Sequence, residues 1–305
     1  MSKIYVIGAL VSDIIFEVPH WVQQNNAVHA THVTLSPGGK GLNQAVAARR
    51  LGGDVSLIGC VGKDVFGGEL LAILKNEDVN IDHVAQHETA RTSLVGIIVK
   101  DNIPGFIGAP DASKKVTEED IRSALAEITS DDILLLGFEI PQPLVQVALQ
   151  IGRDIGATTV VNPAPYFTTD SFVLNYLHLV DILLPNTLEA QLLTETQTDD
   201  MDILAKELMA FGVKQVVMTH GESGSTFFDG QNKITQPSFA VDVVDTTGAS
   251  DAFVGAFCVG LSQGWSVEKM LEFASATAGL ACTVHGTMSS MPARNAVDDL
   301  LAQSE

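Results

Sequence analysis

The 305-residue sequence is poor in cysteine and in basic residues. Its three cysteines, Cys60, Cys258 and Cys282, are odd in number and far apart, which excludes a disulfide framework and shows no zinc-binding spacing. Each lies in an apolar stretch, so we expect all three in the core. The 17 Lys and Arg residues face 37 Asp and Glu residues, a net charge of −20. This composition argues against nucleic-acid binding, and an anionic ligand would need local features such as a helix N-terminus or a metal ion.

Long hydrophobic runs are also missing. The apolar run at residues 4–10 is followed two positions later by Ser12 and Asp13, and it is too short for a signal peptide. No run reaches the ~18 residues that a membrane span needs. No stretch rich in Pro, Gly or Ser separates two halves, and no internal repeat occurs. We therefore expect a single domain over residues 1–305, in the cytoplasm and without a membrane partner.

What the sequence does contain is an alternation of strand and helix patterns. Short apolar runs typical of buried strands lie at residues 4–8, 55–59, 133–137, 159–162, 181–185 and 215–219. Segments of helical period lie at residues 43–51, 67–75, 142–154, 187–194, 201–211, 249–263 and 267–284. This order predicts an α/β fold, doubly wound, with a mostly parallel central sheet flanked by helices on both faces.

Two regions break this alternation. Residues 14–36 and 91–107 show period-two patterns with turn residues between them. We expect short antiparallel strands there, outside the main sheet, which form a small β-sheet lid over one end of the domain.

The strongest local motif is the segment Asp245-Thr246-Thr247-Gly248-Ala249-Ser250-Asp251-Ala252-Phe253, which leads into the apolar helix at 249–263. One interpretation is an ordinary helix cap. The other is an anion site, because unpaired N–H groups at a helix N-terminus receive phosphate. A carboxylate at that position suits a base that accepts a proton from an attacking hydroxyl. The residues alone leave both interpretations open.

Other polar motifs lie near expected strand ends. Gly38, Gly39 and Gly41 surround Lys40 and permit close approach of a ligand. The segment is no Walker A loop, and no G-x-G-x-x-G follows the first strand, which weighs against a nicotinamide dehydrogenase. Asn186-Thr187-Leu188-Glu189 reads first as a helix cap, and alternatively as a pair that organises water around Mg²⁺.

Together these motifs resemble the PfkB carbohydrate kinases and, within that family, the ribokinases. The resemblance runs from Gly8 to about Pro292. It rests on residues 38–45 and 245–253, on Asn162-Pro163-Ala164-Pro165 and on the pair Asn186 and Glu189. It implies a ribokinase-like fold and ATP-dependent transfer of the γ-phosphate to a primary hydroxyl of ribose or a related pentose. A nucleoside or ketohexose kinase of the same family is the alternative.

The resemblance also implies a set of site residues. Asp251 would be the catalytic base, and an anion hole would be formed by the N–H groups of Gly248, Ala249, Ser250 and Asp251. The substrate would contact Val11, Asp13, Gly39, Lys40, Asn43, Glu139 and Asp251. The nucleotide would lie along Asn186, Thr219, His220, Gly221, Glu222, Ser223, Gly224, Ser250 and Ser275. Mg²⁺ would be held through waters by Asn186 and Glu189. K⁺, as a monovalent activator, would be bound by Asp245, Thr247, Ala281, Val284, Gly286 and Ser290, largely through carbonyl oxygens. The lid would pair two subunits into a homodimer.

Two residues depart from the family pattern. Ser250 stands where the family usually has glycine, and a positive φ there would strain the turn and favour a catalytically weakened, sugar-binding regulatory protein. Val11 replaces an asparagine that ribokinases use against the sugar. Because valine cannot hydrogen-bond a hydroxyl, D-ribose is not assured as the substrate.

Overall fold

The computed structural model describes residues 2–101, 103–165 and 172–303. A nine-stranded sheet crosses the body of the molecule in the order β13-β12-β11-β10-β9-β8-β1-β4-β5. Its strands are β1 (Lys3–Ile7), β4 (Asp54–Gly62), β5 (Asn80–His87), β8 (Ile133–Leu136), β9 (Thr158–Val161), β10 (Ile182–Leu183), β11 (Gln215–Thr219), β12 (Ser225–Phe228) and β13 (Lys233–Gln236). The strands from β5 to β11 are parallel, whereas β12 and β13 form an antiparallel edge.

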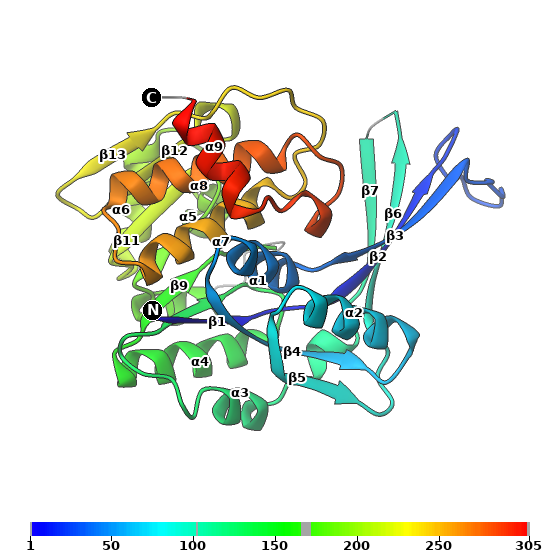
Figure 1. The fold of residues 1–305 in the computed structure, drawn as a ribbon, viewed down its shortest axis with the longest axis horizontal. Helices are drawn as coiled ribbons and strands as arrows, with labels where there is room; N and C mark the ends of the chain where they lie inside the picture. The colour runs from blue at the N-terminus through cyan, green and yellow to red at the C-terminus, as the bar shows by residue number, and fades with distance from the viewer. Residues whose placement is uncertain (1, 102, 166–171, 304–305) are drawn as a thin grey trace.

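Helices cover both faces of this sheet (Figure 1). They are α1 (Lys40–Arg50), α2 (Val65–Asn76), α3 (Glu118–Ala124), α4 (Gln142–Ile155), α5 (Thr187–Thr194), α6 (Met201–Ala210), α7 (Ala249–Ser262), α8 (Val267–Ala281) and α9 (Arg294–Ala302). One apolar core lies between the sheet and α1, α2, α7, α8 and α9, and a second between the sheet and α3 to α6. Buried on both faces, the central strands read as continuous apolar runs. The predicted doubly wound fold is confirmed.

A second sheet of four strands, the lid, extends away from the body (Figure 1). Its order is β3 (His32–Gly38), β2 (Val11–Glu17), β6 (Ser93–Lys100) and β7 (Ile103–Ala109). The expectation of antiparallel strands is wrong for one pair, because β2 and β6 are parallel. Their direction has a simple cause. β2 follows β1 and β6 follows β5, so both leave the same end of a parallel sheet.

Several elements were not predicted from the sequence. β5 is an edge strand with polar residues at most positions and little burial, so its apolar pattern is weak. The short helix α3 owes its start to a capping box between Thr117 and Asp120. None of the described helices has the length and apolarity that spanning a bilayer requires.

Candidate active site

The N-terminus of α1 is packed tightly against the end of β1. A Cβ atom at Gly41 would lie 2.6 Å from the Cα of Gly8, so two glycines allow these segments to touch. Gly39 precedes the helix with φ of +92°, and a Cβ there would lie 2.5 Å from the carbonyl oxygen of Ala9. Gly39 and Gly41 of this motif are therefore needed for backbone contact.

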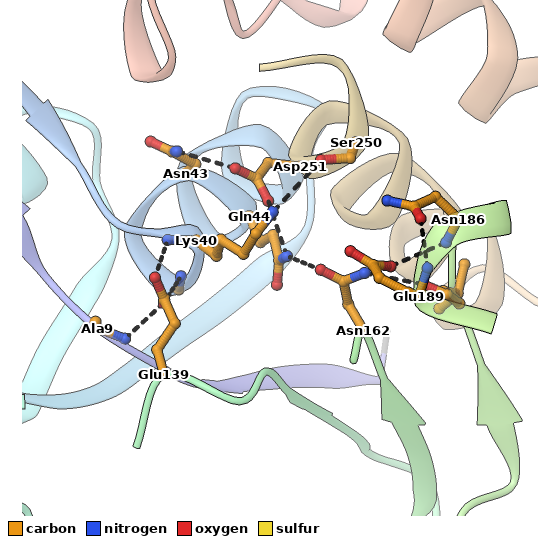
Figure 2. Close-up of polar contacts among 12 residues, drawn as sticks. Ala9, Lys40, Asn43, Gln44, Glu139, Asn162, Asn186, Glu189, Ser250 and Asp251 are labelled. Atoms are coloured by element: carbon orange, nitrogen blue, oxygen red, sulfur yellow. Dashed lines mark hydrogen bonds and ion pairs between the residues drawn. The ribbon is translucent and has the colours of Figure 1, made fainter. Parts of the chain in front are cut away.

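Glu139, which follows β8, satisfies the N–H groups at this junction. Its Oε1 accepts the N–H of Lys40 at 2.9 Å, and its Oε2 accepts those of Ala9 and Gly41 at 3.0 Å each (Figure 2). Burial raises the pKa of Glu139, and the three N–H donors act in the opposite direction. Predicted as a sugar ligand, Glu139 thus uses both carboxylate oxygens to hold the loop that carries Lys40.

Asp251 lies in the first turn of α7 and is only 2% exposed. Its Oδ2 accepts the Nδ2 of Asn43 at 3.0 Å, and its Oδ1 lies 3.3 Å from the ammonium of Lys40. Burial lowers the pKa of Lys40, but the nearby carboxylates of Asp251, Glu139 and Glu189 raise it. The net effect is a raised pKa, which keeps the ammonium charged. The structure therefore brings together three of the predicted site residues from α1 and α7.

Gln44 and Asn162 belong to the same network, although the sequence analysis gave them no role. Gln44 donates to Asp251 Oδ1 at 3.0 Å and to Asn162 Oδ1 at 3.1 Å. Spacing could have revealed Gln44, because Lys40, Asn43 and Gln44 at positions i, i+3 and i+4 share one helix face. Asn162 follows β9, so its place after a predicted strand was a signal that it lies at this edge of the sheet, but its contact with Gln44 comes only from the fold.

Asp13 on β2 is 7% exposed, and within the described residues no donor to its carboxylate is found. Burial and then the charge of Glu139 raise its pKa to about 7. Val11, two residues earlier and on the same face of β2, is equally buried and lies against Gly39. The inner end of the lid thus presents one ionisable and one apolar side chain beside α1.

The backbone of Ser250 is helical, so the strain that a positive φ would cause is absent. Its hydroxyl lies 3.5 Å from the ammonium of Lys40. No side chain of the described ranges caps α7. Gly248 is the N-cap, and the N–H of Ala249 already donates to the carbonyl of Thr246 at 3.2 Å. Of the four N–H groups predicted for an anion hole, this one is therefore engaged.

Asn186 and Glu189 form a capping box at the start of α5. The N–H of Glu189 donates to Asn186 Oδ1 at 2.8 Å, and the N–H of Asn186 donates to Glu189 Oε2 at 2.9 Å. The cap interpretation is thus realised. Burial raises the pKa of Glu189, while the N–H of Asn186 and the charge of Lys40 lower it. The second carboxylate oxygen and the amide suit Mg²⁺, which prefers oxygen ligands and retains waters.

Most of the predicted nucleotide residues, apart from Ser250, lie on neighbouring segments. Asn186 bridges to Thr219, and the N–H of His220 closes the following loop on the carbonyl of Gly224 at 2.9 Å. Ser275 on α8 contacts the hydroxyl of Ser225 at 3.3 Å, beside this loop.

Three of the residues predicted for K⁺, Asp245, Thr247 and Gly286, are joined by hydrogen bonds. Asp245 accepts the N–H groups of Thr247 and Gly286 at 3.0 and 2.9 Å, which joins residues 245–247 to the segment after α8. Although burial opposes it, these bonds and the Thr247 hydroxyl lower the pKa of Asp245. Ala281 ends α8, Val284 is exposed and Ser290 is buried. The described residues contain no cluster of three or more His, Cys, Asp or Glu side chains that could hold a metal directly.

A doubly wound α/β body, a β lid and a buried carboxylate at a helix N-terminus together define a small-molecule phosphotransferase. The comparisons agree. The model of the pfkB family carbohydrate kinases matches residues 1–294, and the chain belongs to this family. It is therefore a carbohydrate kinase.

Named relatives support this result. The chain is 31% identical over 295 residues to ribokinase from Haemophilus influenzae, covering 95% of both chains. It is 29% identical over 306 residues to deoxyribokinase from Salmonella typhimurium, covering 99% of both. Among solved structures, it is similar to Arabidopsis thaliana ribokinase complexed with ribose and ATP, with a TM-score of 0.89, 29% identity and 99% of both chains covered.

Proposed function

We propose that this protein transfers the γ-phosphate of ATP to a primary hydroxyl of a pentose or pentose-like sugar, with Asp251 as the base. The observation that carries the proposal is the buried Asp251 carboxylate in the first turn of α7, fixed by Lys40 and Asn43. The ribokinase relatives support a sugar as acceptor, and the ribose- and ATP-bound Arabidopsis structure supports ATP as donor.

In the proposed reaction the substrate hydroxyl gives its proton to Asp251. Its oxygen forms a bond to the γ-phosphorus as the bond between that phosphorus and the β,γ-bridging oxygen breaks, which leaves ADP. The N-terminus of α7 receives the negative charge of the transferring group. Lys40 lies 3.3 Å from Asp251 and adds a positive charge at the same position. Phosphoryl transfer requires mainly such positioning and charge stabilisation.

The remaining groups have supporting roles. Asp13 and Asn43 form hydrogen bonds with sugar hydroxyls. In support, the buried Asn43 Oδ1 has no hydrogen-bond partner within the described chain. The Thr219–Gly224 segment and Ser275 border the nucleotide. Asn186 and Glu189 would hold Mg²⁺ through waters, and the ion would neutralise charge on the phosphates. Asp245 and the segment that follows α8 would hold K⁺.

At larger scale, we propose that residues 1–305 act as one domain in the cytoplasm and that the lid pairs two copies. The support for pairing is exposed apolar surface on lid strands, where Leu35 is 57% exposed and Phe106 and Ile107 are each 63% exposed.

Kinetics of Asp251→Asn test the proposed base. We expect sugar and ATP to bind nearly as before, while kcat falls by ~10²–10⁴, the usual range for a general base. Binding of each substrate is measured by calorimetry and kcat by a coupled assay over pentoses, hexoses and nucleosides, with K⁺ and with Na⁺ in its place. A loss in kcat of less than about threefold, well below the range for a general base, would show that Asp251 is not the base and has only a structural role in the helix. Equal rates in Na⁺ and K⁺ would remove K⁺ as an activator.

The alternatives differ in acceptor or in turnover. A nucleoside or ketohexose as the best acceptor in the same screen would replace the pentose. The regulatory-protein alternative loses its main support, because Ser250 has a helical backbone.

A further inference from the structure

Gln44 connects the proposed base to the end of the central sheet. The side chain is 1% exposed, and both hydrogens of its amide are used: one in the bond to Asp251 Oδ1 and one in the bond to Asn162 Oδ1 (Figure 2). Asn162 is 3% exposed, and its Nδ2 donates to the backbone carbonyl of Leu184 at 2.8 Å. A chain of three hydrogen bonds therefore runs from Leu184 to Asp251.

The direction of these bonds is fixed by chemistry. The carbonyl of Leu184 can only accept, so Asn162 must turn its NH₂ group toward it. The Asn162 oxygen then faces Gln44, which must present its own NH₂ group. Consequently Gln44 can offer Asp251 only a donor, and a flipped amide would break two bonds at a buried position.

This arrangement makes the two oxygens of Asp251 unequal. Oδ1 has two donors, Gln44 at 3.0 Å and Lys40 at 3.3 Å. Oδ2 has one, Asn43 at 3.0 Å. A carboxylate oxygen accepts about two hydrogen bonds, so Oδ2 keeps room for a further donor. A substrate hydroxyl that donates to this oxygen would displace none of the hydrogen bonds that the protein makes to Asp251.

The far end of the chain of bonds lies beside the nucleotide segment. Leu184 is followed by Pro185 and Asn186, and Asn186 begins α5 as its N-cap. The orientation of the base is thus tied to the backbone that leads to the proposed Mg²⁺ and nucleotide residues. No other described side chain connects these two parts of the site through hydrogen bonds to Asp251.

We propose that Gln44 and Asn162 are positioning residues that hold Asp251 with Oδ2 open to receive the hydroxyl proton. The inference rests on the proposed function, since it takes Asp251 as the base.

Gln44→Met tests the inference, because methionine fills a similar volume but offers no donor. We expect kcat to fall about 10- to 100-fold, as a lost hydrogen bond to a charged group predicts. KM for sugar and for ATP should change little. The acidic limb of the kcat–pH profile should move to higher pH, because the carboxylate loses a donor that favours its charged form.

A matched control is Thr159→Val on β9, the strand that Asn162 follows. Thr159 is also fully buried and donates to a backbone carbonyl, that of Leu179, at 2.8 Å, but it has no bond to the base. It should lower thermal stability and leave the acidic limb in place. If Gln44→Met does not fold, Asn162→Leu is the second variant. It breaks the same series of hydrogen bonds at its far end and should move the acidic limb of the kcat–pH profile in the same direction.

A double-mutant cycle separates the inference from the proposed function. In the Asp251→Asn background, Gln44→Met should cause almost no further loss of kcat, because Gln44 acts through Asp251. If the two substitutions lower kcat independently, so that their fold-losses multiply in the double variant, the inference is overturned. It is also overturned if Gln44→Met has a normal kcat and an unchanged acidic limb of the pH profile while Asp251→Asn is inactive. An active Asp251→Asn would instead overturn the proposed base itself.

Discussion

At the scale of single residues, Ser250 shows why a departure from a family pattern needs backbone geometry before it is interpreted. The sequence allowed either a strained or a relaxed serine, and φ decides between them. In the first turn of α7 a serine keeps its N–H directed out of the helix end, and its hydroxyl lies 3.5 Å from Lys40. Nothing in this geometry weakens the proposed anion hole.

We expect Ser250→Gly to change kcat by less than about tenfold, a difference of ~1.4 kcal/mol in the barrier. Ser250→Ala is the control that keeps the helical preference and removes only the hydroxyl. Both are measured with saturating sugar and ATP. A gain of a hundredfold or more for the glycine variant would mean that the natural serine disables the site.

Val11 concerns which sugar is bound. It is 7% exposed, next to Gly39 and on the lid face that carries Asp13. A sugar hydroxyl directed at it would lose a hydrogen bond, which costs on the order of 1–3 kcal/mol. We therefore expect D-ribose to be a poor or middling substrate and a sugar or nucleoside that is apolar at that point to be better.

Kinetics of Val11→Asn with D-ribose and 2-deoxy-D-ribose check this prediction. The variant should raise kcat/KM for ribose and lower the preference for the deoxy sugar. Val11→Ile, which stays apolar, is the control. Efficient use of ribose by the natural protein, together with weaker use by Val11→Asn, would contradict it.

The site residues differ in how far the sequence could predict them. Asp251, Lys40 and Asn43 lie in two dense motifs, and the structure places them in contact. Glu139 was predicted to face the sugar, and its role of holding three backbone N–H groups is a second one that a strand-end carboxylate alone does not reveal. Gln44 and Asn162 are 118 positions apart, so only the fold brings them together.

At the scale of elements, most strands buried on both faces were predicted, because burial on both sides requires an unbroken apolar run. The buried four-residue strand β12 was missed, since Ser225 and Thr226 interrupt its apolar pattern. The partly exposed strands β5 and β13 of the main sheet were not predicted, since polar residues lie on both of their sides. The lid strands were predicted from their period-two pattern, but that pattern does not show whether two strands pair in parallel or antiparallel. The parallel β2–β6 pair follows from the body, where β1 and β5 point the same way.

The lid also carries a prediction about assembly. Phe106 and Ile107 are neighbours on β7, so their side chains lie on opposite faces, and both are 63% exposed. Apolar surface on both faces exceeds what covering a small sugar requires. We expect the natural protein to be a dimer and the double variant Phe106→Asp, Ile107→Asp to be a monomer, since two carboxylates cannot be buried unpaired.

Sedimentation velocity at several concentrations measures this directly. Val65→Asp is the control, because Val65 is 82% exposed but lies on α2, outside the lid. It should remain a dimer. A natural protein that sediments as a monomer throughout, or a double variant that stays dimeric, would remove the lid as the pairing surface.

At the scale of the whole molecule, the site joins segments from most of the chain. Lys40 follows the lid, Glu139 follows β8, Asn162 follows β9 and Asp251 lies in the first turn of α7. They meet because the carboxyl ends of parallel strands lie at one edge of the sheet. Because the protein carries a net charge of −20, its overall field repels phosphate groups. The helix N-terminus and Lys40 provide the local positive charge that offsets this repulsion at the site.

The cost of this arrangement should appear as a dependence of stability on pH. Burial and Glu139 raise the pKa of Asp13 to about 7 in the folded protein, from an ordinary value near 3.8. Below the ordinary value, Asp13 is protonated in both the folded and the unfolded chain. Between the two values the unfolded chain releases a proton that the folded protein retains, so rising pH favours unfolding. The stability present at low pH is lost as pH rises through about 7.

Replacing Asp13 by Asn removes this titration. The quantity to compare is the unfolding free energy of Asp13→Asn minus that of the natural protein, both without ligands. We expect this difference to be larger at pH 8 than at pH 5 by ~2–3 kcal/mol. Urea unfolding at each pH measures it, and Asp131→Asn, an exposed aspartate away from the lid, is the control that should show no such growth. The same variant should bind sugar less well at pH 8, because it loses the charged acceptor for hydroxyl groups. A gain that is equal at both pH values would mean that Asp13 is already ionised in the folded protein throughout this range.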